Sequence, residues 1–215
     1  MAEFIALYVV IFLFSVIIHE VMHGVVALKF GDRTAERAGR LTLNPIPHID
    51  PIGTILLPGL MFLSASQGFI FPFFIGWAKP VPVNPLNFSN IRQGELWVSA
   101  AGVLANFSLA AILTLVFHLV KGLDINFTVL SLLVASINLN LILGIFNMFP
   151  IPPLDGSKIL MALLPYRLAR EYQRLEQYGF LILIIFLMIP YGNSTLLQTA
   201  LGFLLDIFRE ILGLV

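Results

Sequence analysis

The chain has 215 residues and a formal net charge of zero, with 59% hydrophobic and 11% charged residues and no cysteine. Roughly a quarter of the residues in a soluble domain are charged, so this composition excludes an ordinary soluble protein and indicates a polytopic membrane protein. The charge balance gives no reason to expect a nucleic-acid partner, and the lack of cysteine excludes disulfides and thiolate metal ligands.

The first apolar stretch, residues 4–30, carries ionisable side chains where a membrane helix is expected to be apolar. His19, Glu20 and His23 lie within one short run of it. Residues four apart share a helix face, so the two imidazoles can reach one metal ion with Glu20 beside them. Each ionisable group in a membrane span costs about 2.5–3.5 kcal/mol and usually marks function. We therefore predict a metal site, and zinc suits its ligands.

The N-terminus lacks the basic region of a cleavable signal peptide, so we expect the stretch 4–30 to be retained. Spans of this kind use up most of the chain. We therefore expect residues 1–215 to form a single integral-membrane domain.

The second apolar stretch, residues 52–77, is interrupted by glycines, prolines and a polar segment, which leaves each half too short to span as a helix. We predict a re-entrant hairpin here. This topology places nearly all lysines and arginines on one membrane face, which the positive-inside rule makes cytoplasmic. A full crossing would split these charges between the two faces. The hairpin also places the histidine pair inside the bilayer, toward the cytoplasmic side.

Further apolar stretches complete the predicted fold, at residues 96–120, 129–149, 178–190 and 195–213. The predicted fold class is therefore an all-α polytopic membrane protein. It has about five to six apolar helices, the re-entrant hairpin and short membrane-associated strands.

A third metal ligand is needed, because a catalytic zinc typically has three protein ligands and a water. Asp155 is the best candidate, since it follows the stretch 129–149 in a proline-rich turn and precedes Gly156. The prolines end the helix, and the glycine permits a tight backbone path back toward the histidines. An ordinary helix-capping turn is the alternative, and Asp50 and Glu171 are rival ligands.

Taken together, the run His19–His23 and the segment 147–156 resemble the site-2 protease family of intramembrane zinc metalloproteases. The run Gly102-Val103-Leu104-Ala105-Asn106 is similar to that family's glycine and asparagine motif, and the likeness covers most of residues 4–165. The segments 41–45 and 76–80 look like those of small bacterial and archaeal members. Unlike many relatives, this chain leaves no room for a PDZ domain.

The resemblance implies that His19, His23 and Asp155 bind one catalytic zinc ion and that Glu20 activates water. It implies an enzyme that hydrolyses peptide bonds in or near transmembrane segments of membrane proteins, as in regulated intramembrane proteolysis. The expected location is the cell membrane of a bacterium or archaeon. The expected partners are a transmembrane protein substrate and the lipid bilayer.

Three further side chains are candidates for support of the oxyanion or the substrate. Asn147 can donate to a developing oxyanion, Asn106 serves packing or site support, and His48 lies on the approach to the site. Without the family pattern, helix association is the preferred explanation of the two asparagines, and His48 fits an ordinary loop histidine. A substrate helix must also unwind before cleavage, so an edge strand in 40–44 or 79–84 is expected to hold it extended.

A function of another class is a noncatalytic membrane protein that binds or transports a divalent metal ion. Transporters typically show inverted repeats and ionisable groups on several helices. The sequence shows neither feature, and Glu20 beside two ligands favours activation of water.

Overall fold

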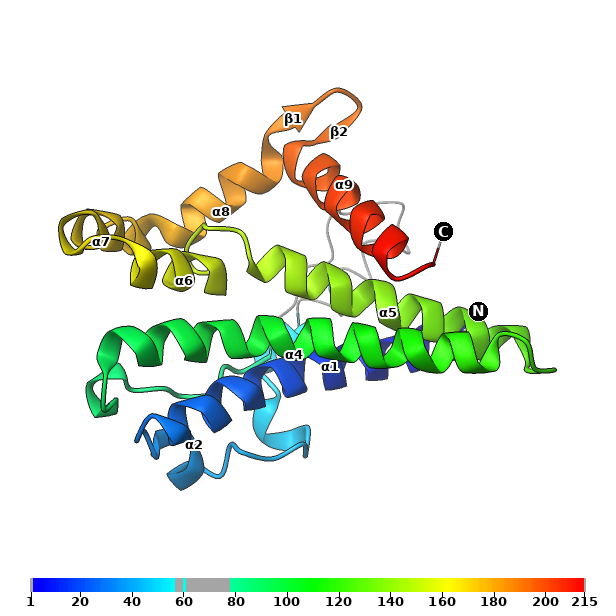
Figure 1. Cartoon of the computed structure of the whole chain (residues 1–215), viewed down its shortest axis with the longest axis horizontal. Coiled ribbons are helices and arrows are strands. Elements are labelled where there is room, and N and C mark those ends of the chain that lie inside the picture. The colour runs from blue at the N-terminus through cyan, green and yellow to red at the C-terminus, as the bar shows by residue number, and fades with distance from the viewer. Residues whose placement is uncertain (1, 57–59, 61–77, 215) are drawn as a thin grey trace.

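Three long apolar helices form the body of the protein. The computed structural model describes residues 2–56, 60 and 78–214. Within these residues, α1 (Ala2–Lys29), α4 (Ile91–Val120) and α5 (Phe127–Asn147) are each long and apolar enough to cross a membrane. They lie side by side, with α4 packed against both α1 and α5 (Figure 1). The protein is therefore a mostly helical integral membrane protein.

Side-chain caps set where two of these helices begin. Asn90 accepts a hydrogen bond from the backbone N–H of Gln93 at the start of α4, and Asn126 accepts one from Thr128 at the start of α5. Such caps satisfy backbone donors that a helix leaves free at its first turn. Helix α4 thus begins at Ile91 rather than at residue 96, because a cap and not hydropathy decides its start.

Short elements follow α1: α2 (Thr34–Arg37), η1 (Ile46–His48), η2 (Pro51–Leu56) and η3 (Pro85–Asn87). The predicted re-entrant hairpin at 52–77 lies mostly outside the described residues. Its flanks are described, and the N–H of Lys79 donates to the carbonyl oxygen of His48 at 2.8 Å. The two flanks of this segment are therefore in contact.

The strands predicted at 40–44 and 79–84 are wrong, because neither segment is a β-strand. In 79–84, Pro80 and Pro82 have no N–H to donate, and three of the four remaining N–H groups bond elsewhere: Lys79 to His48, Val81 to Glu20 and Asn84 to Asp32. The two described strands are β1 (Pro190–Tyr191) and β2 (Ser194–Thr195), which pair antiparallel.

The C-terminal part consists of shorter helices, of which α6 packs against α4 and α9 packs against α5. They are α6 (Asp155–Leu163), α7 (Tyr166–Gln173), η4 (Glu176–Tyr178), α8 (Gly179–Met188) and α9 (Leu196–Ile211). Helices α8 and α9 form an arch over α5 (Figure 1). At 10 and 16 residues, they are shorter than a spanning helix of about 20 residues. Three candidate spans are therefore described, where the sequence predicted five to six apolar helices.

The apolar core lies where α4, α5 and α9 meet. Ala110, Ile137 and Leu141 are almost fully buried there, and side chains of α9 pack against them. Phe107 of α4 stacks on Phe208 of α9, with ring centroids 5.0 Å apart. These contacts hold α9 to the two long helices.

An arginine fixes α6 to the start of α4. Arg92 donates to the carbonyl oxygens of Ala162 at 2.5 Å, Leu163 at 3.1 Å and Leu164 at 3.0 Å. Carbonyls at the end of a helix lack partners within the helix and favour a cation. This clamp fixes the C-terminal end of the helix whose first residue is Asp155.

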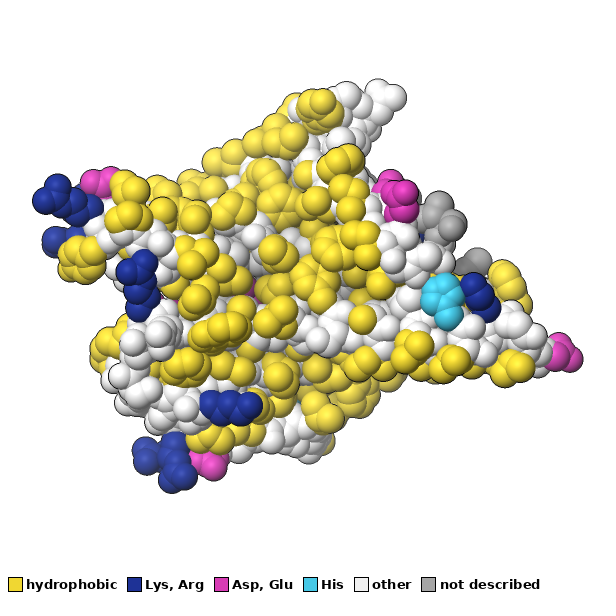
Figure 2. All heavy atoms as spheres, viewed as in Figure 1, with side chains coloured by type: hydrophobic (Ala, Val, Ile, Leu, Met, Phe, Trp, Pro, Cys, Tyr) yellow, Lys and Arg dark blue, Asp and Glu magenta, His cyan; other side chains and the backbone are white. Residues whose placement is uncertain are grey.

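Charged side chains gather at one end of the molecule. Figure 2 shows most of the visible lysines and arginines at the end that carries α2 and α7, while apolar side chains cover the middle. Lys121 caps the opposite end of α4.

Candidate metal centre

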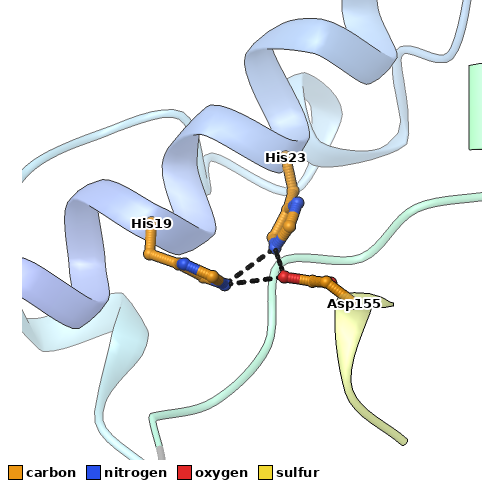
Figure 3. Close-up of side chains that lie close together, drawn as sticks. All are labelled: His19, His23 and Asp155. Atoms are coloured by element: carbon orange, nitrogen blue, oxygen red, sulfur yellow. Dashed lines mark hydrogen bonds and ion pairs between the residues drawn. The ribbon is translucent and has the colours of Figure 1, made fainter. Parts of the chain in front are cut away.

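Three possible metal donors converge between α1 and α6. His19 Nε2 and His23 Nε2 lie 3.0 Å apart, and Asp155 Oδ2 lies 3.1 Å from the first and 3.3 Å from the second (Figure 3). Donors about 2.0–2.2 Å from a tetrahedral zinc ion are roughly 3.3 Å from one another. The group therefore has the size of a zinc site.

The other ring nitrogens fix how the two histidines are protonated. His23 Nδ1 lies 2.6 Å from the carbonyl oxygen of Val98, and His19 Nδ1 lies 2.6 Å from Asn106 Oδ1. Both oxygens can only accept, so each Nδ1 must carry the hydrogen. Each Nε2 then presents a lone pair, as a metal ligand must.

Without a cation, the three converging atoms repel one another. Asp155 Oδ2 is buried and has no hydrogen-bond donor among the described residues, and it faces two unprotonated nitrogens. A buried acceptor without a partner costs about 1–3 kcal/mol, and more when it is charged. A divalent cation would satisfy all three atoms, so the donor set fits zinc.

Local sequence explains how each donor reaches the site. The spacing of four residues puts His19 and His23 on one face of α1. Asp155 is the first residue of α6, after a turn that ends α5. A β-carbon at Gly156 would overlap the backbone of Met148 and Phe149, so only glycine lets this turn close.

Helix α4 holds the two imidazoles by hydrogen bonds and close packing. Val98 and Asn106 accept their Nδ1 hydrogens, and Gly102 lies between these two residues on the same face. A β-carbon at Gly102 would lie 2.6 Å from ring atoms of both histidines.

Glu20 is held in place by the segment that follows η2. Its Oε2 accepts a hydrogen bond of 2.9 Å from the backbone N–H of Val81. This contact fixes the carboxylate at the wall of the cavity that the three possible metal donors also line.

The cavity has a volume of about 530 Å³. Besides Glu20 and the three donors, its lining includes Asn147, whose Nδ2 donates to the carbonyl oxygen of Leu143 at 3.0 Å. An amide nitrogen carries two hydrogens, so Asn147 keeps a second one for donation. Charged side chains also line the cavity, namely Glu95, Lys158 and Glu176.

Two of the predicted support residues, Asn106 and His48, are not part of the cavity lining. Asn106 is fully buried and bonds to His19 behind the site, and His48 is not among the cavity-lining residues. His48 Nε2 donates to the carbonyl oxygen of Thr42 at 2.9 Å. Burial lowers the pKa of His48, which suits a neutral loop histidine.

The rival ligands lie elsewhere. Asp50 Oδ1 accepts from the backbone N–H groups of Ile52 and Gly53, at the start of η2. Glu171 is exposed on α7. The donors that converge are therefore the two histidines and Asp155.

Two supporting groups were missed in the sequence. The carbonyl oxygen of Val98 belongs to the backbone and leaves no residue-type signal. The clamp formed by Arg92 depends on the meeting of α4 and α6, and a single arginine at a helix start does not reveal it.

Comparisons with known proteins give a consistent result. The model of peptidase family M50 matches residues 118–190, which include Asp155. YwhC of Bacillus subtilis, a zinc metalloprotease candidate by its name, is 38% identical over 87% of this chain and 83% of its own length. Rip2 of Mycolicibacterium smegmatis, also named as a candidate, is 32% identical over 84% of this chain and 66% of its own length.

A shorter match is to the zinc metalloprotease MJ0392 of Methanocaldococcus jannaschii. It is 40% identical over 34% of this chain and 21% of its own length. No solved structure matches the chain.

Proposed function

Because the chain belongs to peptidase family M50 and is an intramembrane zinc metalloprotease, we propose that His19, His23 and Asp155 hold the zinc ion and that Glu20 is the general base. The observation that carries this assignment is the convergence of three electron-rich atoms with no hydrogen-bond donor for Asp155 Oδ2 in the described structure. When bound, zinc lowers the pKa of water toward about 7 and polarises a carbonyl group.

Glu20 transfers a proton from the attacking water to the leaving amine. It lines the same cavity as the three donors, on the residue directly after His19. A carboxylate within hydrogen-bond reach of a water can take its proton and later deliver it to the leaving amine. The N–H of Val81 holds Oε2 of this carboxylate, which limits the positions that Glu20 can adopt.

Asn147 binds the negative charge that develops on the substrate carbonyl oxygen. Its amide lies in the cavity wall with one N–H held by Leu143, which leaves the second for the substrate. A fixed donor aimed at a developing oxyanion stabilises the transition state. Asn106 acts instead by orienting His19.

The substrate is a transmembrane segment of another membrane protein, bound extended beside residues 80–85. Pro80, Val81, Val83 and Pro85 line the cavity, and residues 80–84, which lead into η3, are not paired in a sheet within the described structure. A peptide can lie along such a backbone through the groups that remain free.

The site opens toward the cytoplasm of a bacterial or archaeal cell. The end that carries α2 and α7 holds the basic side chains, and basic loops mark the cytoplasmic face (Figure 2). The hydrogen bond between Lys79 and His48 supports this topology, because it brings together both flanks of the predicted hairpin.

The test measures zinc content and cleavage of a transmembrane substrate by the purified protein in detergent, beside the Glu20→Gln variant. We expect about one zinc ion in each protein, with a loss of cleavage of about 10²-fold or more in the variant. Cleavage at the wild-type rate by Glu20→Gln would refute the mechanism. Zinc in both proteins without cleavage by either would favour the noncatalytic metal-binding alternative.

A further inference from the structure

A chain of buried amides runs from the metal centre into the middle of the helix bundle. His19 Nδ1 bonds to Asn106 Oδ1 at 2.6 Å, and Asn106 Nδ2 donates to Asn140 Oδ1 at 3.0 Å. Asn140 Nδ2 in turn donates to the carbonyl oxygen of Ser136 at 2.9 Å. Asn106 is 0% exposed and Asn140 1%, so water does not compete for these bonds.

The carbonyl oxygen of Ser136 determines which group donates in each of these hydrogen bonds. The carbonyl oxygen of Ser136 can only accept, so Asn140 must turn its NH₂ group toward it. Asn140 then presents its oxygen to Asn106, which must donate and must turn its own oxygen toward His19. Asn140 Nδ2 also lies 3.1 Å from Ser15 Oγ. A hydroxyl can donate or accept, and therefore it does not set the direction.

We propose that Asn140 is a positioning residue that fixes, through Asn106, the tautomer in which His19 can bind the metal ion. This inference rests on the proposed function, because it assumes that His19 Nε2 is a zinc ligand. An oxygen at Asn106 requires hydrogen on His19 Nδ1 and leaves the lone pair on Nε2. The carbonyl oxygen of Ser136 on α5 thus determines, through two amides, which nitrogen of His19 on α1 carries the hydrogen.

The opposite tautomer would close the site without metal. A hydrogen on His19 Nε2 would point at Asp155 Oδ2, which is 3.1 Å away. The resulting bond to a carboxylate would be strong, because one partner is charged. It would satisfy the oxygen that otherwise lacks a donor, and metal would then have to displace it. The hydrogen bonds through Asn106 and Asn140 disfavour this metal-free state, in which His19 donates to Asp155.

A purely packing role for Asn140 predicts a different pattern. Amides between membrane helices often serve only to join them. In that case Asn140→Leu, which has a similar shape, should leave metal binding intact once the protein folds. A buried aspartate at this position should weaken metal binding more than leucine does. The tautomer role predicts the reverse. An aspartic acid at 140 keeps an acceptor for Asn106, whereas leucine removes it.

The experiment compares wild type with Asn140→Leu, Asn140→Asp and Thr114→Val. The last is a matched control, because buried Thr114 donates to the carbonyl oxygen of Ala110 within α4 and has no part in the chain. Each metal-free protein in detergent is titrated with Co²⁺, and its visible absorption gives the dissociation constant. The ¹⁵N shifts of the His19 ring report the tautomer directly.

We expect Asn140→Leu to weaken Co²⁺ binding by about tenfold or more, as losses of outer-shell partners do. We also expect it to populate the tautomer with hydrogen on Nε2. Asn140→Asp should bind within a few-fold of wild type, as should Thr114→Val. Equal Co²⁺ affinity for wild type and Asn140→Leu would overturn the inference alone, whereas no binding by wild type would also overturn the zinc assignment.

If Asn140→Leu fails to fold, the tautomer of His19 in the wild-type protein provides a second test. Its metal-free form should carry the His19 hydrogen on Nδ1. A hydrogen on Nε2 would overturn the inference whatever the variants do.

Discussion

The α-carbon of Gly102 lies so close to the two imidazoles that a β-carbon there would stand 2.6 Å from His19 Nε2 and 2.6 Å from His23 Cε1. The rings cannot simply retreat, because Asn106 and Val98 hold them at Nδ1. We therefore expect Gly102→Ala to weaken metal binding by about tenfold or more, the range seen when ligands lose their orientation. Helix propensity favours the alanine by about 1 kcal/mol, so metal affinity and helix stability should move in opposite directions.

Gly202→Ala is the matched control for this effect. Gly202 also lies inside a helix, α9, but a β-carbon there would meet nothing within 4 Å. Zinc retention should be unchanged in this variant. Equal zinc retention by Gly102→Ala would show that the imidazoles have room to move.

Asp155→Asn tests the proposal that Asp155 is the third metal ligand. The amide keeps the shape of the side chain but removes the negative charge, which a divalent cation prefers in a ligand. We expect metal affinity to fall by at least about tenfold. Competition with a chelator of known affinity measures the change.

Asp50→Asn serves as the control, because an amide oxygen can still cap the residues that Asp50 caps. Its metal affinity should equal that of wild type. Loss of zinc in Asp50→Asn, with full retention in Asp155→Asn, would reverse the assignment.

The Arg92 clamp should matter for both stability and metal binding. Arg92→Ala removes three hydrogen bonds to the end of α6, and we expect the free energy of unfolding to fall by about 1–3 kcal/mol. Asp155 begins the same helix, so zinc should also be lost more readily to a chelator.

Arg33→Ala is the control for the loss of an arginine that does not bond to α6. Arg33 makes an exposed ion pair with Glu36, with a distance of 3.4 Å between Nε and Oε2. Pairs of this kind contribute about 0–1 kcal/mol. If both variants kept zinc and stability equally well, the clamp would have no role in holding α6.

Asp32 should make part of the stability depend on pH. Burial alone would raise its pKa, but hydrogen bonds from Asn84, Asn87 and Thr34 outweigh burial, and the pKa lies below its ordinary value. The folded state therefore binds a proton less readily than the unfolded state. The resulting stability is present above the unfolded pKa of about 3.9 and is lost as pH falls through the lower folded value.

Limited proteolysis of the loop around residues 81–87 at pH 7 and near pH 3 measures this loss. The difference between the two pH values should shrink in Asp32→Asn, since that side chain does not titrate. Asp206→Asn is the control, because Asp206 is exposed and its oxygen lies 3.9 Å from Arg209. An unchanged pH difference in Asp32→Asn would exclude Asp32 as its source.

Local sequence rules predicted the parts of the site that depend on one helix or one turn. The spacing of His19 and His23 requires only that α1 be helical, and the turn at Asp155 depends on its own prolines and on Gly156. The three long helices were predicted for the same reason, since apolar runs of this length have one stable form in a membrane.

Contacts between distant segments could not be predicted from patterns along the chain. The sequence left Asn106 open between packing and site support, and only its position opposite His19 distinguishes them. Helices α6 and α7 were missed because they are short and amphipathic and carry no long apolar run. The segment 79–84 was predicted to be a strand, but the N–H groups of Lys79, Val81 and Asn84 bond to side chains and loops of other elements.

The metal donors lie at two places far apart in the sequence, on α1 and at the start of α6. A bound ion would therefore join the first helix of the chain to its C-terminal third, as a disulfide does in a secreted protein. This chain has no cysteine with which to make such a covalent link. Joining distant segments lowers the entropy of the unfolded chain, and the effect grows slowly with the length of the loop that is closed. Zinc would then act as a removable cross-link, and a chelator that stops proteolysis would also loosen the fold.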